Sequence, residues 1–400
     1  MGTHFAFVSM PAAGHLTPTL PLVAELVRRG HRVSYATGTD MLETVRAAGA
    51  DPIPAPFVMP GGPPPGPVSG GKEQRVAPRV EAFADSVEQT FPVLTDRFTA
   101  DPPAAVCGDA MSPVSSLVAQ RLGLPHVALN PSFASNEHFS LRRDVMSASP
   151  DMEIFETAFR TVGERIAAFA SRQGLEFDAA GGLSCPGELN LVFIPREFQM
   201  AGETFDESFV FCGPSLADRA AAEAGWEPRD PDTPLLLVSL GTVFNDRPEF
   251  FLTCADAFAG GEWQVLMSVG ARTDPADIGP LPAGIEARPH VPQVQVLSRA
   301  AGFVTHNGMN STMEALYLGV PQIGVPQMPE QDANARRVEE LGCGRRLDPR
   351  TADAATLRST VDAVVADPDV RDAAGAMSGR LRAADGPAAG ADALEALVAA

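Results

Sequence analysis

Histidine and carboxylate side chains that could move protons stand at the ends of predicted strands. His15 follows an apolar strand at residues 4–10, and Asp109 ends a strand that begins at Ala104. An imidazole titrates near neutrality and can take a proton from a hydroxyl, while a carboxylate on its other nitrogen fixes the tautomer and stabilises the imidazolium. We therefore predict that His15 is a general base oriented by Asp109. On its own, each residue also fits a structural role, as a local hydrogen bond at a helix start or as a cap for the helix after Ser112.

A strand, a tight turn and a helix follow one another in residues 302–314. The buried strand runs directly into His306 and Gly308, and a helix opens at residues 310–312. A helix start of this kind leaves backbone N–H groups unpaired at the positive end of the helix dipole, which is a binding site for phosphate. Glu314, one turn into the helix, could hydrogen-bond ribose hydroxyls. The segment therefore predicts a phosphate site with a ribose beside it.

The elements around these residues alternate between strands and helices. After the first strand, Thr17 and Pro18 have the types of an N-cap and a first helical residue, and Gly30 ends that helix. Strand, loop, helix and strand in this order form a βαβ unit, and hence a parallel sheet covered by helices. The order restarts at Leu235, after residues 214–234, which have no hydrophobic periodicity. We predict an α/β protein of two doubly wound, Rossmann-like domains facing a central cleft that contains the carboxyl ends of the strands.

The predicted domain boundaries follow from this pattern. Residues 1–216 form the first domain, residues 217–233 a linker, residues 234–386 the second domain, and residues 387–400 a terminal helix. The length of 400 residues fits two or three domains.

Composition narrows the partners and the compartment. The formal net charge of −20 argues against nucleic acid or an anionic membrane surface as a partner. The five cysteines have neither metal-ligand spacing nor an even count, so we expect reduced core thiols. The chain starts directly with a strand, and no apolar run approaches the length that spans a bilayer. We predict a cytoplasmic protein, either a monomer or a homodimer.

The stretch from residue 290 to residue 331 resembles the donor-binding signature of the UDP-sugar glycosyltransferases, glycosyltransferase family 1. Val-Pro-Gln, Leu, Phe-x-x-His-x-Gly-x-x-Ser-x-x-Glu, Gly-Val-Pro, Pro-Gln and acid-Gln occur in this order with fixed spacing. The resemblance extends over nearly the whole chain through residues 14–18, 107–109, 211–215 and 238–242. The chain is similar above all to the bacterial macrolide-type glycosyltransferases. This resemblance favours the role of His15 as a general base oriented by Asp109 over the structural roles given above.

The resemblance implies the GT-B fold, whose last helix crosses back to the first domain, and a nucleotide sugar held by the second domain. The nucleotide base would contact backbone groups of Val291 and Gln293, and the ribose would contact the Glu314 carboxylate. The sugar hydroxyls would bind to the acid–amide pair Glu330 and Gln331. The diphosphate would bind at the turn before the helix, to Thr242, His306, Asn307, Gly308, Asn310, Ser311 and Thr312.

Two residues depart from the family's pattern. The signature often begins with a tryptophan that stacks on uracil, and here the residue is His290, which leaves UDP and dTDP sugars both open. The residue after His306 is usually glycine or alanine, and here it is Asn307. Asparagine tolerates left-handed backbone, so we expect the turn to survive. We also expect its amide to be able to reach the phosphates or the sugar.

The acceptor and metal predictions rest on weaker patterns. Apolar residues of first-domain loops and helices suit an adaptable pocket, although each also suits core packing. The acidic pairs at residues 230–232 and 367–369 contain proline, and turn or cap roles fit them better than a metal site. We expect no metal and no cofactor beyond the nucleotide-sugar co-substrate. The predicted acceptor-binding residues are Met59, Phe83, Phe133, Asn136 and Met146.

The resemblance implies an inverting glycosyltransferase that moves glucose from UDP-glucose to a hydroxyl of a macrolide or a flavonoid or other phenol. For a macrolide acceptor, such a transfer would give antibiotic resistance. A C-glycosyltransferase and a dTDP-sugar-dependent enzyme are close alternatives. An epimerase or hydrolase of the same fold, and a sensor that binds a nucleotide sugar without turnover, are more distant ones.

Overall fold

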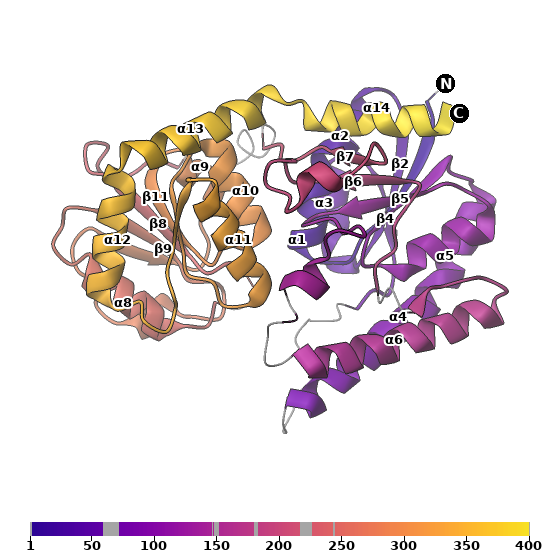
Figure 1. Ribbon diagram of the computed structural model, residues 1–400, viewed down its shortest axis with the longest axis horizontal. Coiled ribbons are helices and arrows are strands. Elements are labelled where there is room, and N and C mark those ends of the chain that lie inside the picture. Colours follow the sequence, from indigo (N-terminus) through magenta and orange to yellow (C-terminus); the bar gives the residue numbers. More distant parts are fainter. Residues whose placement is uncertain are drawn as a thin grey trace. The chain divides into compact units, whose positions relative to one another are not determined.

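The computed structural model describes residues 2–58, 72–145, 147, 152–179, 183–216, 226–242 and 245–399. The chain divides into two compact units (Figure 1). Unit 1 contains Met1–Gly213 and Asp385–Ala400, and unit 2 contains Pro214–Ala384. The stretch predicted as a linker, residues 217–233, thus belongs to unit 2, and residues 226–233 are its described part.

Unit 1 is built on a seven-stranded parallel sheet in the order β3-β2-β1-β4-β5-β6-β7. The chain winds outward from β1 on one side and from β4 on the other, so the order reverses between these two strands. Ligands of open α/β sheets bind at the carboxyl ends of the strands beside such a switch point. The strands are β1 His4–Val8, β2 Arg32–Thr37, β3 Asp51–Pro54, β4 Ala105–Asp109, β5 His126–Asn130, β6 Leu189–Val192 and β7 Phe209–Phe211.

Helices cover both faces of this sheet because its strands are apolar on both sides. Phe5 and Phe7 of β1 enter the core beneath α2, α3 and α14, and Ala6 and Val8 enter the core beneath α4, α5 and α6. This alternation is the period-2 geometry of a strand buried on both faces. The helices of unit 1 are α1 Ala13–Leu16, η1 Thr17–Thr19, α2 Leu20–Arg28, η2 Thr39–Met41, α3 Leu42–Ala47, α4 Lys72–Ala100, α5 Pro113–Leu122, the π-helix η3 Leu141–Val145, α6 Met152–Arg172, η6 Gly202–Thr204 and α14 Gly386–Ala399.

The terminal helix α14 lies along α2 (Figure 1). Its Leu394 is fully buried, which contributes about 1.5–3 kcal/mol. Arg29 donates hydrogen bonds to Asp392 at 2.6 Å and to Glu395 at 3.0 Å, and His31 contacts Glu395 at 2.7 Å. The carboxylates of these pairs are 70% and 37% exposed, so the pairs contribute little beside the apolar burial that holds the helix in place.

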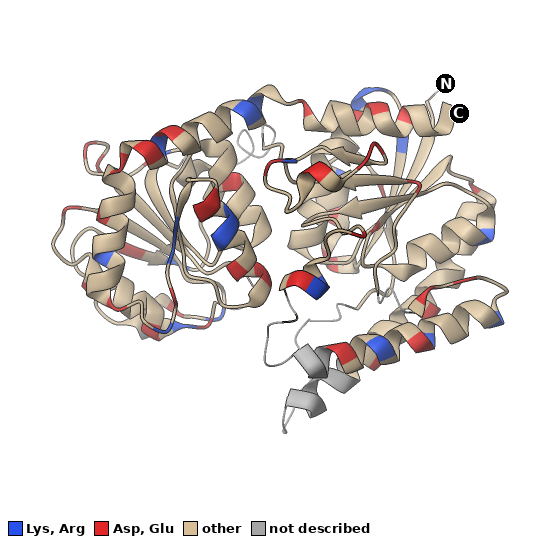
Figure 2. Cartoon of the chain, in the orientation of Figure 1, with Lys and Arg blue, Asp and Glu red and all other residues tan. Residues whose placement is uncertain are grey.

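The long helices α4 and α6 pack together and carry charges of both signs. Acidic and basic bands alternate along α6 (Figure 2). Arg165 of α6 donates to Asp85 and, at 3.1 Å, to Glu88 of α4.

Within the described ranges, every helix is too short or too polar to cross a membrane.

Unit 2 is a six-stranded parallel sheet in the order β10-β9-β8-β11-β12-β13, with its switch point between β8 and β11. Leu236 and Val238 of β8 enter the core under α8 and α12, and Leu235 and Leu237 enter the core under α9 and α10. The elements are β8 Leu235–Ser239, α8 Pro248–Ala257, β9 Gln264–Ser268, η7 Pro275–Ile278, β10 Ile285–Arg288, α9 Gln293–Leu297, β11 Ala300–Thr305, α10 Met309–Leu318, β12 Gln322–Gly324, α11 Pro329–Glu340, β13 Gly344–Arg346, α12 Ala354–Ala366 and α13 Pro368–Ala383.

The two acidic pairs that contain proline form turns and caps, as predicted. Asp230 accepts hydrogen bonds from the Asp232 N–H at 3.0 Å and the Thr233 hydroxyl at 2.7 Å. Asp367 is the N-cap of α13 and accepts from the Asp369 N–H at 2.9 Å. All five cysteines are buried free thiols, which confirms the prediction that they belong to the core.

Candidate active site

His15 and Asp109 meet at the switch point of unit 1. His15 follows β1 and Asp109 ends β4, and these two strands are hydrogen-bonded neighbours. Nδ1 of His15 lies 2.5 Å from Oδ2 of Asp109. A carboxylate can only accept, so Nδ1 carries the proton and Nε2 is left with a lone pair. The His15 side chain is 21% exposed and that of Asp109 is 2% exposed, so the imidazole can be reached while its partner is enclosed.

The Asp109 carboxylate is held on both oxygens. Its Oδ1 accepts from the Met111 N–H at 2.9 Å, and its Oδ2 accepts from His15. The helix α5 begins after Ser112, which makes no side-chain cap. Ser112 and not Asp109 is thus the N-cap residue of α5, so the Asp109 side chain does not have the capping role that was the alternative to catalysis.

The helix that carries His15 begins earlier than predicted. It starts at Ala13 with Ala12 as the N-cap, so Thr17 and Pro18 are not its start. Because Pro18 has no N–H to donate, the helix tightens into the 3-10 turn η1 before α2 continues it. His15 therefore lies within a helical turn rather than on a loop, which limits its freedom.

In unit 2, the start of α10 lies at the switch point between β8 and β11. Gly308 is the N-cap, and the first bond of the helix runs from the Thr312 N–H to the Gly308 carbonyl at 3.0 Å. The N–H groups before that bond belong to Met309, Asn310 and Ser311, and they stand at the positive end of the dipole. The Thr312 side chain is fully buried. The prediction of Thr312 as a phosphate contact is therefore wrong, because its N–H is used within the helix.

His306 lies buried between two glycines. A Cβ atom added to Gly241 or to Gly308 would come within 2.4 Å of its Nε2. Burial lowers the pKa of His306 to about 4. The ring is therefore neutral at pH 7, and it can give a phosphate a hydrogen bond but no positive charge.

The Asn307 amide does not point where it was predicted to point. The side chain is fully buried, and its Nδ2 donates to Gln322 Oε1 at 2.9 Å and to Thr312 Oγ1 at 3.3 Å. The expectation that this amide reaches phosphates or sugar is therefore corrected. Its left-handed backbone, with φ of 56°, turns the side chain into the unit rather than out of it.

The ribose candidate Glu314 already has a partner. Gln293 donates to Glu314 Oε2 at 2.6 Å and to Ser311 Oγ at 3.1 Å. Glu314 is only 4% exposed, so this amide fixes the direction of its carboxylate. Val291 is partly buried against the core beneath α9 and α10. The predicted contacts of Val291 and Gln293 with the base use backbone groups and stay predictions.

The acid–amide pair stands in the first turn of α11. Glu330 is half-buried, and the Oε1 atom of the buried Gln331 accepts from the Gln327 N–H at 2.8 Å. Thr242 is exposed just after β8, at the same switch point as His306. These three positions stay predictions for sugar and phosphate contacts.

The described acceptor residues are used in packing. Phe83 is 1% exposed in the core beneath α4. Phe133 stacks on Phe198 with ring centroids 5.6 Å apart. The Asn136 amide donates to Thr204 and accepts from the N–H groups of residues 138 and 139. These contacts show what each side chain packs against or bonds to, and the acceptor roles of the three residues stay predictions. Met59 and Met146 lie outside the described residues.

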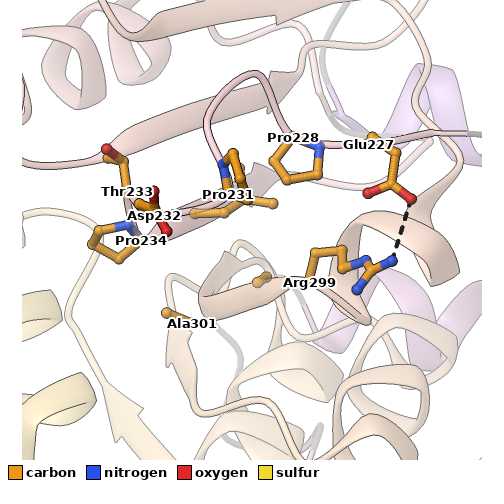
Figure 3. Close-up of a pocket in the computed structure, with 10 residues that line it drawn as sticks. Glu227, Pro228, Pro231, Asp232, Thr233, Pro234, Arg299 and Ala301 are labelled. Atoms are coloured by element: carbon orange, nitrogen blue, oxygen red, sulfur yellow. Dashed lines mark hydrogen bonds and ion pairs between the residues drawn. The ribbon is translucent and has the colours of Figure 1, made fainter.

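A cavity of about 360 Å³ lies at the amino ends of the unit 2 strands, at the end of the sheet away from the candidate donor residues. Residues 227–228, 231–235 and 299–301 line it at the amino ends of β8 and β11, and Arg299 contacts Glu227 across it at 3.2 Å (Figure 3). The candidate donor residues are at the carboxyl ends of the same strands, so this cavity is not the donor site.

Buried amides behind the unit 2 turn were missed by sequence reasoning. Gln322 and Asn334 are fully buried, and the buried Asn245 donates to the Gly241 carbonyl at 2.7 Å. The signal was present for Gln322, which is a polar residue at the start of an otherwise apolar strand. Among the described residues there is also no group of three His, Cys, Asp or Glu side chains placed to hold a metal ion.

Comparisons with known proteins agree with this arrangement. The C-terminal domain family described as erythromycin biosynthesis protein CIII-like matches residues 257–397. NDP-glycosyltransferase YjiC of Bacillus licheniformis is 38% identical over 399 residues, which cover 99% of this chain and 98% of that protein. Demethyllactenocin mycarosyltransferase of Streptomyces fradiae is 35% identical over 99% of this chain and 86% of its own length.

The solved structure of the calicheamicin glycosyltransferase CalG4 covers 99% of this chain and 98% of its own, with a TM-score of 0.84 and 33% identity. Matches of this identity extend over both units, and they include the strands and helix starts that carry the candidate site. The chain therefore belongs to the UDP-sugar glycosyltransferase family, glycosyltransferase family 1, and is a glycosyltransferase of the GT-B fold similar to the bacterial macrolide-type enzymes.

Proposed function

We propose that the protein is an inverting glycosyltransferase that moves glucose from UDP-glucose to a hydroxyl of a hydrophobic natural product such as a macrolide or a flavonoid. The observation that carries the proposal is the 2.5 Å contact between His15 Nδ1 and Asp109 Oδ2. It leaves Nε2 of a reachable imidazole as the proton acceptor, which is what transfer to a hydroxyl requires.

In this mechanism, Nε2 of His15 takes the acceptor's hydroxyl proton as the oxygen attacks the anomeric carbon. The bond between that carbon and the diphosphate oxygen breaks, and its electron pair leaves with UDP. Asp109 stabilises the imidazolium that forms. A single displacement inverts the anomeric configuration, so an α-linked donor gives a β-glycoside.

The leaving diphosphate is proposed to bind at the start of α10. The N–H groups of its first turn and the helix dipole stabilise negative charge. The neutral His306 adds a hydrogen bond, and Glu314, oriented by Gln293, takes the ribose. Glu330 and Gln331 take the sugar hydroxyls. Since the helix start supplies the charge stabilisation, we propose that no metal ion takes part.

A dTDP sugar is the second candidate donor. His290, at the position where the family's signature often has tryptophan, is exposed and offers a smaller ring for stacking on the base. The relative from Streptomyces fradiae is named for transfer of mycarose, so enzymes this similar do not all carry the sugar that we propose.

A mass-spectrometric screen tests the function. UDP-glucose and dTDP-glucose are each incubated with macrolide and phenolic acceptors, and a product heavier by one hexose is expected with UDP-glucose. The coupling constant of the anomeric proton then reports the linkage, and an α-glycoside would overturn inversion. Donor incubated without acceptor is the control, because an epimerase or a hydrolase would convert it unaided.

A further inference from the structure

Asn307 has a backbone conformation that non-glycine residues rarely adopt. Its φ of 56° is in the left-handed region, which only Ala201 shares among the described non-glycine residues. The residue stands between His306 and Gly308, in the middle of the turn proposed to receive the diphosphate. Such outliers persist only where the surrounding structure holds them, and they concentrate at functional sites.

Four side chains hold Asn307 in this conformation. Thr305 accepts from its backbone N–H at 3.1 Å, and Asn334 donates to its carbonyl at 2.9 Å. Gln322 and Thr312 accept from its amide nitrogen at 2.9 Å and 3.3 Å. The four come from β11, α11, β12 and α10. We call these five residues the Asn307 cage.

The Asn307 cage is closed to solvent. Each of its five residues has 0% exposure. Gln322 also donates to the Thr312 carbonyl at 3.3 Å, which ties β12 to the start of α10. The Asn307 Oδ1 atom packs against Gly324, where an added Cβ would come within 2.3 Å. The amide therefore cannot contact a ligand, and any effect it has on the site acts through the turn.

Buried polar groups cost free energy unless they are hydrogen-bonded, and apolar side chains could fill the same volume without that cost. Hydrogen bonds to particular partners instead specify one geometry, and the Asn307 cage keeps them even though the Oδ1 atoms of Asn307 and Asn334 have no hydrogen-bond partner. Here the geometry is that of three consecutive residues, since fixing Asn307 fixes the directions of the flanking His306 and Gly308.

We propose that Asn307 is a positioning residue of the donor site. The Asn307 cage holds the turn so that the His306 imidazole and the first N–H groups of α10 are already in place when the donor diphosphate arrives. A site ordered in advance binds more tightly because less freedom is lost on binding. This inference rests on the proposed donor site.

Asn307→Gly and Gln322→Met test it. Glycine adopts the left-handed backbone without strain, so Asn307→Gly removes only the amide. Gln322→Met keeps the length of the side chain but removes both the acceptor for the Asn307 amide and the donor to the Thr312 carbonyl. Titration calorimetry of each intact variant with UDP, and separately with dTDP, is expected to show about tenfold weaker binding, which is within the net effect of the two buried hydrogen bonds that each variant removes. The KM for the donor sugar rises in parallel and the KM for the acceptor does not. The double variant loses little more than either single one, because both changes open the same network.

Asn190→Ala is the matched control. Asn190 is a buried amide of β6 in unit 1, hydrogen-bonded to Gly187 and Ser208. This variant is expected to lower Tm and to leave UDP affinity unchanged. If Asn307→Gly binds UDP as tightly as the wild-type protein, or if Asn190→Ala loses as much UDP affinity as Asn307→Gly, the positioning role of Asn307 is overturned. Neither result would contradict the proposed donor site. Failure of the wild-type protein to bind either nucleotide overturns the donor site itself. If Gln322→Met does not fold, Asn307→Gly decides alone.

Discussion

The two units present the same architectural position with opposite chemistry. In each, a histidine follows a strand at the switch point of a parallel sheet, His15 in the helical turn after β1 and His306 directly after β11. His15 is partly exposed and contacts a carboxylate at 2.5 Å. His306 is buried between glycines, and burial lowers its pKa to about 4. One environment favours a protonated imidazole after proton transfer, and the other disfavours it.

The difference shows that residue type and fold position do not decide what a histidine does. The groups packed around the ring decide it. In unit 1, the Asp109 carboxylate makes His15 a base. In unit 2, burial keeps His306 neutral, and the buried amides behind the turn hold it as a hydrogen-bonding group.

The largest effect is expected for His15→Ala. Removing a general base should lower kcat by about 10²–10⁴-fold. UDP affinity should stay within about threefold, because the nucleotide is assigned to unit 2. Initial rates with UDP-glucose and calorimetry with UDP measure the two quantities. Full activity in this variant would remove His15 from the mechanism.

Asp109→Asn should lower kcat by about 10²-fold while preserving shape. The amide nitrogen can donate to Nδ1, which moves the proton to Nε2 and blocks the atom that must accept one. The thermal unfolding midpoint reports whether the fold is intact. A rate equal to that of the wild-type protein would mean that Asp109 does not set the tautomer.

Gly308→Ala tests the enclosure of His306. Gly308 has an ordinary φ of −59°, so the cost is steric: the new Cβ would come within 2.4 Å of Nε2. Displacing the ring should weaken UDP binding by about 10–100-fold, since a hydrogen bond to a charged group is lost. Gly375→Ala is the control, because an added Cβ there meets nothing within 4 Å. Equal UDP affinities for both variants would exclude His306 from the donor site.

The location of both histidines at the carboxyl ends of strands could be predicted from the sequence, because the carboxyl ends of parallel strands meet at one end of a sheet. That reasoning located His15, Asp109 and the start of α10 without any knowledge of packing. The directions of side chains within a turn could not be predicted. The Asn307 side chain faces inward because its φ is positive, and residue type alone does not determine the backbone angles of such a turn.

The acceptor residues could not be singled out from the sequence for a related reason. Phe83 and Phe133 are apolar residues at helix and loop positions, and such residues look alike whether they line a pocket or fill a core. The start of the first helix was misplaced because Ala12 is not a typical N-cap, whereas Thr17 followed by Pro18 looks like a helix start. Local signals there were overridden by the helical turn that forms at Ala13, four residues before Thr17.

Acid should destabilise unit 2 through His306. The unfolded pKa of 6.5 exceeds the folded value of about 4, so the unfolded chain binds more protons between these values and stability falls as the pH drops from 6.5 towards 4. At pH 5 the expected loss is about 2 kcal/mol. Hydrogen bonds from Arg28 and Arg29 hold the pKa of Glu25 at about 2, so that carboxylate's contribution is lost only below about pH 4.5, which is lower than the pH 5 at which the loss is evaluated.

Urea unfolding at pH 7 and pH 5 measures this, with His306→Gln as the comparison. The variant should lose about 2 kcal/mol less than the wild-type protein between the two pH values. The buried His126 of unit 1, whose pKa burial also lowers to about 4, is unchanged in both proteins and provides a reference transition. An identical pH response in the two proteins would show that His306 is not buried in its neutral form.

Chelation should have the smallest effect. If the first-turn N–H groups of α10 and the neutral His306 stabilise the leaving diphosphate, then treatment with EDTA followed by desalting should change kcat/KM for UDP-glucose by less than about twofold. Added Mg²⁺ should not increase the rate of the treated enzyme beyond that of the untreated one. A loss of more than about tenfold that Mg²⁺ restores would mean that charge on the leaving group is neutralised by a cation. Unit 2 would then supply the shape of the donor site, and its helix start would no longer account for the chemistry assigned to it.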